Sequence, residues 1–113
     1  MTVAVRLTKA WSPVGGLPIA KLPGQMGVFE LADREHKVLL IAEAGGRSRF
    51  GLRGELEREL RDAPQARFYR YEVTTAYRTR FIELLMAHVA DHGDVPPLNV
   101  GRATPSLGRL SPA

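Results

Sequence analysis

The chain has 113 residues, of which 44% are apolar and 25% charged, as expected for one globular domain and too few residues for two separate cores. It contains no cysteine, which excludes disulfide bonds and cysteine-based zinc sites. The net charge of +4 comes from 13 arginines and 3 lysines against 12 acidic residues, and the planar guanidinium of arginine suits phosphate or carboxylate partners. This balance permits a polyanionic partner, although it also fits a role in solubility alone.

The sequence predicts neither a membrane protein nor an exported one. Its longest apolar run is five residues, from Val38 to Ala42, which is far shorter than a membrane span. The first residues, MTVAVRLTKAWSP, contain no apolar stretch of signal-peptide length and no small-residue cleavage site. We therefore expect a cytoplasmic protein without a membrane partner.

The first half of the chain predicts strands followed by a helix. Residues 3–7 alternate weakly, as in an edge strand, and the prolines and glycines of residues 11–24 predict an irregular approach. Residues 28–33 and 37–43 are apolar runs around a charged turn, which predicts a β-hairpin. A leucine repeat then predicts a helix that closes at Asp62 and Pro64. The repeat consists of Leu52, Leu56 and Leu60.

The second half predicts one more strand and one more helix. Residues 67–73 have strand composition, and Thr74 or Thr75 is expected to cap a helix that ends at Gly93. The apolar stripe of this helix is Tyr77, Phe81, Leu84, Leu85, His88 and Val89. The whole order predicts an α+β fold, a three-stranded antiparallel sheet flanked by helices. We expect an N-terminal extension (1–21), a folded domain (22–100) and a flexible C-terminal tail (101–113).

Residues 22–44, LPGQMGVFELADREHKVLLIAEA, resemble the opening of a GIY-YIG nuclease domain, most like that of the bacterial excision-repair endonuclease. In that family a Leu-Pro pair stands three residues before Gly-Val-Tyr. Ten residues then lead to Tyr-Val-Gly or Tyr-Ile-Gly, followed by a lysine. Here Leu22-Pro23 precedes Gly27-Val28-Phe29 at the same spacing, and ten residues lead to Leu40-Ile41-Ala42 and then Glu43, without a gap.

The resemblance extends over residues 22–100 and implies the positions of a site. The family has an arginine on its first helix, for which Arg53 is the match and Arg49 the reserve, and a later glutamate that holds a divalent metal. Glu83 matches that glutamate and would hold Mg²⁺ or Mn²⁺. The catalytic positions implied by the match are Phe29, Leu40, Arg53, Glu83 and Asn99.

The departures from the family pattern predict a loss of its chemistry. Phe29 and Leu40 replace the two family tyrosines, and neither side chain can donate, accept or lose a proton. We therefore expect a GIY-YIG-like domain without nuclease activity that binds nucleic acid, with DNA favoured, or a protein partner. The alternative is a working metal-dependent endonuclease in which His36, Tyr69 or Tyr71 replaces the missing general base.

The expected nucleic-acid contacts are arginines near the start of the first helix. Arg47, Arg49 and Arg53 precede the first acidic residue of this segment, Glu55, and a helix N-terminus favours anions. The simpler alternative for Arg53 is an ion pair with Glu57 one turn ahead. Glu83 lies off the apolar stripe, so a solvated surface position explains it equally well.

Two further groups have both a functional and a structural interpretation. Tyr69 and Tyr71 share one face of their strand and would stack on bases if exposed, although tyrosines in strands more often face a core. His88 and His92 are spaced to hold a metal ion, but no third ligand with clear geometry accompanies them.

Overall fold

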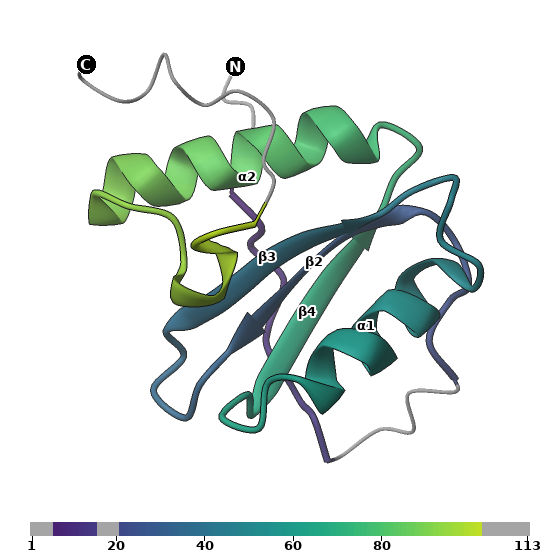
Figure 1. Cartoon of the computed structure of the whole chain (residues 1–113), viewed down its shortest axis with the longest axis horizontal. Helices are drawn as coiled ribbons and strands as arrows, with labels where there is room; N and C mark the ends of the chain where they lie inside the picture. Colours follow the sequence, from purple (N-terminus) through teal and green to yellow (C-terminus); the bar gives the residue numbers. More distant parts are fainter. Residues whose placement is uncertain (1–5, 16–20, 103–113) are drawn as a thin grey trace.

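Four strands form one antiparallel sheet in a computed structural model that describes residues 6–15 and 21–102 (Figure 1). The strands are β1 (Ser12–Pro13), β2 (Gly27–Ala32), β3 (Val38–Ala44) and β4 (Phe68–Val73), and their order across the sheet is β1-β4-β2-β3. With helices α1 (Gly51–Arg61) and α2 (Tyr77–His92), the chain runs β-β-β-α-β-α. The α+β class is therefore confirmed.

The prediction of three strands was wrong, because β1 adds a fourth at one edge. Ser12 pairs with Tyr69 and Pro13 with Phe68. Two residues are too few to show strand periodicity, and proline is tolerated in a sheet chiefly at an edge, where its missing N–H is not needed. The edge strand expected at residues 3–7 lies partly outside the described residues, and Leu7, which is described, is buried outside any strand.

The predicted hairpin is confirmed, with β2 and β3 paired antiparallel from Gly27 opposite Ala44 onward. Its turn is closed by the Asp33 carboxylate, which accepts hydrogen bonds from the backbone N–H groups of Glu35 and Lys37, each at 2.9 Å. His36 adopts a left-handed backbone conformation in this turn, with φ of 64°.

Both predicted helices are present. Leu52 and Leu56 are buried on α1, which ends at Asp62 as expected. Gly93 ends α2 in a left-handed conformation. The predicted threonine cap of α2 was wrong, because the residue before the helix is Ala76 and the Thr74 hydroxyl instead accepts a hydrogen bond from the Ala76 N–H.

The two helices pack against opposite faces of the sheet, as the alternation of strand residues requires. On β2, Phe29 and Leu31 face one way, and Val28 and Glu30 the other. The α1 face contributes Phe29, Leu31, Leu40, Leu52, Leu56 and Tyr69 to one cluster. The α2 face contributes Leu7, Val28, Ile41, Phe81, Leu84 and Leu85 to the other.

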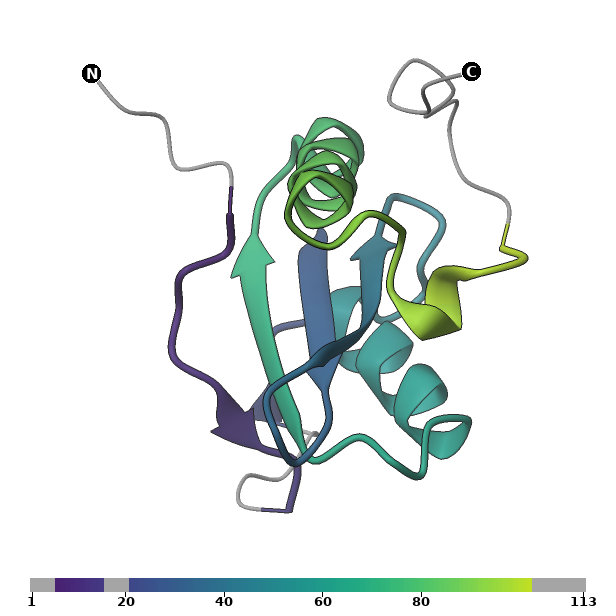
Figure 2. The ribbon, with the colours of Figure 1, turned by 90° about the vertical axis from the view of Figure 1, so that its left-hand side faces the viewer.

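β3 is one of the two edge strands of the sheet, and a short 3₁₀ helix, η2 (Pro97–Asn99), lies beside it (Figure 2). The end of the described chain thus returns to the sheet and lies between α1 and α2. Within residues 6–15 and 21–102, no helix combines the length and apolar character needed to cross a membrane.

Candidate functional site

Phe29 and Leu40, which match the two family tyrosines, are core residues. Their exposed fractions are 0% and 1%, and both pack in the cluster beneath α1 with Leu52 and Leu56. Neither the ring of Phe29 nor the isobutyl group of Leu40 reaches solvent, so these two side chains offer no surface to a substrate.

Glu83 lies on α2, which packs on the other face of the sheet from Phe29 and Leu40. Its side chain is 39% exposed and accepts a hydrogen bond from Arg80 at 3.3 Å, while Arg80 also pairs with Glu72 at 3.0 Å. In the described part of the chain, no group of three or more His, Asp or Glu side chains is arranged to hold a metal ion. Glu83 is thus engaged with Arg80, and no cluster of three or more acidic or histidine side chains surrounds it among the described residues.

Asn99 has a structural task at the edge of the sheet. It is 3% exposed, its amide nitrogen donates to the carbonyl of Ile41, and its amide oxygen accepts from the N–H of Ile41, both at 2.9 Å. The side chain thus forms the pair of hydrogen bonds that a neighbouring strand would otherwise supply to β3. The five positions implied by the resemblance do not converge on one concave surface.

Two backbone N–H groups at the start of α1 are not open to an anion. The N–H groups of Leu52 and Arg53 donate to the carbonyls of Gln25 and Pro23, at 2.9 and 3.2 Å. Gly51 permits this close contact because it has no side chain, and a Cβ at its position would lie 2.5 Å from the backbone of Gly24. Its φ of +57° is also in the left-handed region that favours glycine. The backbone donors that would bind an anion are thus already used by the segment before β2.

The arginines of this region differ in their surroundings, since Arg53 is half-buried and the other two are exposed. The guanidinium of Arg53 lies 5.7 Å from the ring centre of Phe50. Among the described residues, Arg53 does not form the alternative ion pair with Glu57. Arg47 and Arg49 lie in the loop between β3 and α1 and are exposed. No acidic side chain in residues 6–15 or 21–102 forms an ion pair with any of these three arginines.

A groove crosses the free edge of β3 between α1 and α2. It consists of two adjoining hollows of about 530 and 160 Å³. The residues common to both hollows are Glu43, Glu55, Arg58 and Arg78. The larger hollow reaches the Gly45–Ser48 turn and Tyr77, and the smaller one ends at Asn99 and Arg102. This groove brings together elements from both halves of the chain.

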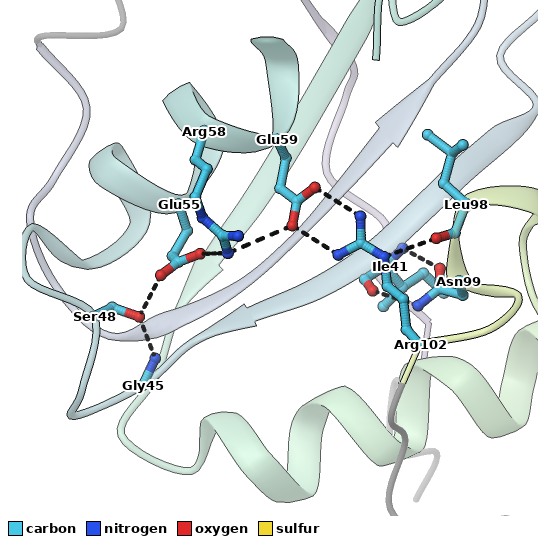
Figure 3. A network of polar contacts seen from close by, with 9 residues as sticks. All are labelled: Ile41, Gly45, Ser48, Glu55, Arg58, Glu59, Leu98, Asn99 and Arg102. Atoms are coloured by element: carbon cyan, nitrogen blue, oxygen red, sulfur yellow. Dashed lines mark hydrogen bonds and ion pairs between the residues drawn. The ribbon is translucent and has the colours of Figure 1, made fainter. Parts of the chain in front are cut away.

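A chain of polar contacts fills one side of this groove (Figure 3). The Ser48 hydroxyl accepts from the Gly45 N–H at 3.2 Å and donates to Glu55 at 2.9 Å, and Glu55 pairs with Arg58. Farther along, Glu59 accepts two hydrogen bonds from Arg102, at 2.7 and 2.8 Å.

The charges in the groove largely compensate one another. The hydrogen bonds from Arg102 hold the pKa of the buried Glu59 carboxyl below its ordinary value, although burial acts in the opposite direction. Glu43, at the position of the family lysine, accepts a hydrogen bond from Arg78 at 3.0 Å through one oxygen, and its other oxygen is buried without a partner. The glutamates of the groove are therefore compensated by ion pairs, whereas Arg47, which also lines the larger hollow, has no acidic partner among the described residues.

The sequence analysis did not predict this groove. One of its ion pairs has a local sequence signal, since Glu55 and Arg58 are three residues apart on α1. The links from Glu43 to Arg78 and from Glu59 to Arg102 join residues far apart in the sequence, so no local pattern could reveal them.

The three alternative general bases, Tyr69, Tyr71 and His36, do not line the groove. Tyr69 is buried beneath α1, and burial raises the pKa of its hydroxyl. Tyr71 packs partly against the same cluster, with the Lys9 ammonium 5.0 Å from its ring centre. His36 contacts the Phe68 ring edge-on at 4.5 Å, in the hairpin turn. The structural interpretation of the two strand tyrosines therefore fits better than base stacking.

The histidine pair lies on a different side of the molecule. His88 and His92 have ring centres 4.3 Å apart and line a separate hollow of about 390 Å³ that also contains the buried Glu30. Burial lowers the pKa of His88, and the neighbouring His92 lowers it further. Burial likewise raises the pKa of Glu30, which pairs with Arg70 at 2.7 Å.

Comparisons with other proteins add a family but no activity. No curated protein and no solved structure matches the chain. A family profile matches residues 5–91, which include all four strands, α1 and most of α2. By this match over most of its length, the chain belongs to the family described as domain of unknown function DUF7508.

Proposed function

We propose that this protein is a GIY-YIG-like domain that has lost the nuclease chemistry of that family and binds nucleic acid, with DNA the favoured partner. The β2-β3 hairpin, α1, β4 and α2 follow one another in the order that the resemblance implies. The gap-free spacing of Leu22-Pro23, Gly27-Val28-Phe29 and Leu40-Ile41-Ala42 supports the same relationship.

The burial of Phe29 and Leu40 supports the loss of catalysis. Cleavage of a phosphodiester needs an activated water and a proton for the leaving group, and a positioned acid or base typically contributes about 10² to 10⁴ in rate. Neither side chain carries a proton to exchange, and both lie in the core beneath α1. Glu83, on the opposite side of the sheet, does not compensate for them.

The observation that carries the binding proposal is the set of three arginines without an internal ion pair. Arg47, Arg49 and Arg53 flank the start of α1, whereas Arg58, Arg78 and Arg102 in the neighbouring groove are paired with glutamates. A guanidinium without an internal partner remains able to form a bidentate contact with a phosphate. We therefore place the proposed contact on the loop before α1, from which Arg47 also lines the larger hollow of the groove.

The binding test compares two double variants that remove the same charge. Arg49→Ala/Arg53→Ala should weaken binding to unrelated DNA sequences about equally and should lower the slope of log K against log salt by about 2, since each phosphate contact contributes about 0.9. Arg34→Ala/Arg61→Ala removes two exposed arginines from the hairpin turn and the end of α1, and should have a smaller effect. Fluorescence anisotropy at several salt concentrations measures both.

Equal losses in the two variants would show that only net charge matters and would contradict the loop assignment. Absence of binding at low salt would overturn the nucleic-acid proposal and favour a protein partner.

The loss of catalysis is tested separately with supercoiled plasmid. We expect no nicking above the metal-only background with Mg²⁺ or Mn²⁺. Nicking that disappears in Glu83→Ala would instead establish the working endonuclease, whereas nicking that persists would indicate a contaminant or another site.

A further inference from the structure

Phe50 is an exposed aromatic residue among the three unpaired arginines. It directly precedes α1, and 53% of it is exposed. The other large apolar residues exposed in the described chain are Val73, Met86 and Val100, none of which is aromatic. In the sequence Phe50 lies between Arg49 and Arg53, so an aromatic ring and cationic side chains are combined on one short segment.

The local structure holds this ring along the first turn of α1. Gly54 lies one turn ahead, and a Cβ at its position would be 2.9 Å from the Cβ of Phe50 and 3.5 Å from the edge of its ring. The glycine therefore leaves room for the aromatic side chain. The Arg53 guanidinium lies 5.7 Å from the ring centre, within the range of a cation–π contact. Phe50 is thus supported from the helix side while much of its surface stays open.

We propose that Phe50 is a stacking platform for an unpaired base, so that the nucleic acid bound by this loop is single-stranded. The inference rests on the proposed function and names the form of its ligand. Single-strand binding sites combine cations that follow the backbone with aromatic rings on which bases stack, and Arg47, Arg49 and Arg53 supply the cations. In a duplex the base faces are already stacked on one another, and opening a step costs a few kcal/mol.

The arrangement also limits sequence specificity. Every base has a flat aromatic face, so stacking tolerates any sequence, and arginine contacts to phosphates carry no sequence information. The ligand is therefore a single strand recognised by its exposed bases and its charge.

The experiment measures binding of labelled oligo(dT), and of a duplex of the same length, to the full chain at low salt. We expect tighter binding to the single strand. Phe50→Ala and Phe50→Leu should weaken single-strand binding by at least about fivefold, as loss of one stacked base does, and Phe50→Trp should retain it. Phe50→Leu is the decisive variant, because it keeps an apolar side chain and removes only the aromatic face.

Met86→Ala is the matched control, since it also removes an exposed apolar side chain, but one on α2 rather than next to α1. Circular dichroism verifies that each variant is folded. Equal affinity for single strand and duplex, with no loss in Phe50→Leu, would overturn the stacking role and leave the arginine contacts standing. A loss in Met86→Ala equal to that in Phe50→Ala would also overturn it. If neither nucleic acid binds, the proposed function fails and this inference fails with it.

Discussion

Asn99→Ala should destabilise the protein strongly, although the resemblance would assign this residue to catalysis. The side chain forms two hydrogen bonds with the backbone of Ile41, both at 2.9 Å, in a position that is almost fully buried. Alanine would leave the Ile41 N–H and carbonyl without these partners, and each buried unsatisfied group costs about 1 to 3 kcal/mol. Because some water can enter the space, we expect a loss of about 2 to 4 kcal/mol in the free energy of unfolding.

Urea denaturation measures this loss, and hydrogen exchange supplies a local readout because the Ile41 N–H should lose its protection. Asn99→Asp is the matched variant. Its carboxylate can still accept from the Ile41 N–H but opposes the Ile41 carbonyl, so it should be destabilising at neutral pH. Burial and this repulsion raise its pKa, so the penalty should diminish as the pH falls and the carboxyl group becomes a donor. A change below about 0.5 kcal/mol in Asn99→Ala, the size of a neutral surface substitution, would refute this account.

Two further predictions concern packing and pH. Gly27→Ala should lower the free energy of unfolding by about 1 to 3 kcal/mol or more, because its Cβ would lie 2.1 Å from the backbone oxygen of Glu72. Gly46→Ala is the control and should be nearly neutral in the same thermal or urea melts, because its Cβ would meet only the Tyr77 hydroxyl, at an ordinary contact distance of 3.9 Å. The depressed pKa of Glu59 contributes stability that is fully present above its ordinary value of 4.5 and is lost as the pH falls through the folded-state value. Glu59→Gln should therefore flatten the acid limb of a stability profile, and an unchanged limb would contradict the assigned role of Arg102.

The sequence was sufficient for the elements whose side-chain patterns are local. Two apolar runs around the charged turn predicted the hairpin, and the leucine repeat predicted α1, because each pattern reflects the burial of side chains along its own segment. The strand β1 escaped prediction because Ser12 and Pro13 show no period and are ordered by pairing with β4. Tertiary pairing, not local preference, decides such a segment.

The site was less predictable than the fold for a related reason. A resemblance transfers positions along a chain, but it does not state whether a replaced side chain still faces a ligand. Phe29 and Leu40 keep their places in the strands and lie entirely in the core. Glu43 and Glu59 find partners on α2 and after η2, which only the folded chain brings close.

The two apolar replacements have an energetic consequence for the proposed function. A hydroxyl at either position would be buried beneath α1, and without a partner it would cost about 1 to 3 kcal/mol. Phe29 and Leu40 avoid that cost, and burial of each contributes about 1.5 to 3 kcal/mol instead. Phe29 and Leu40 thus stabilise the sheet at two positions where an unpartnered hydroxyl would destabilise it. In the groove, Glu43, Glu55 and Glu59 each pair with an arginine, although one Glu43 oxygen is buried without a partner, whereas Arg47, Arg49 and Arg53 form no ion pair with an acidic side chain of residues 6–15 or 21–102.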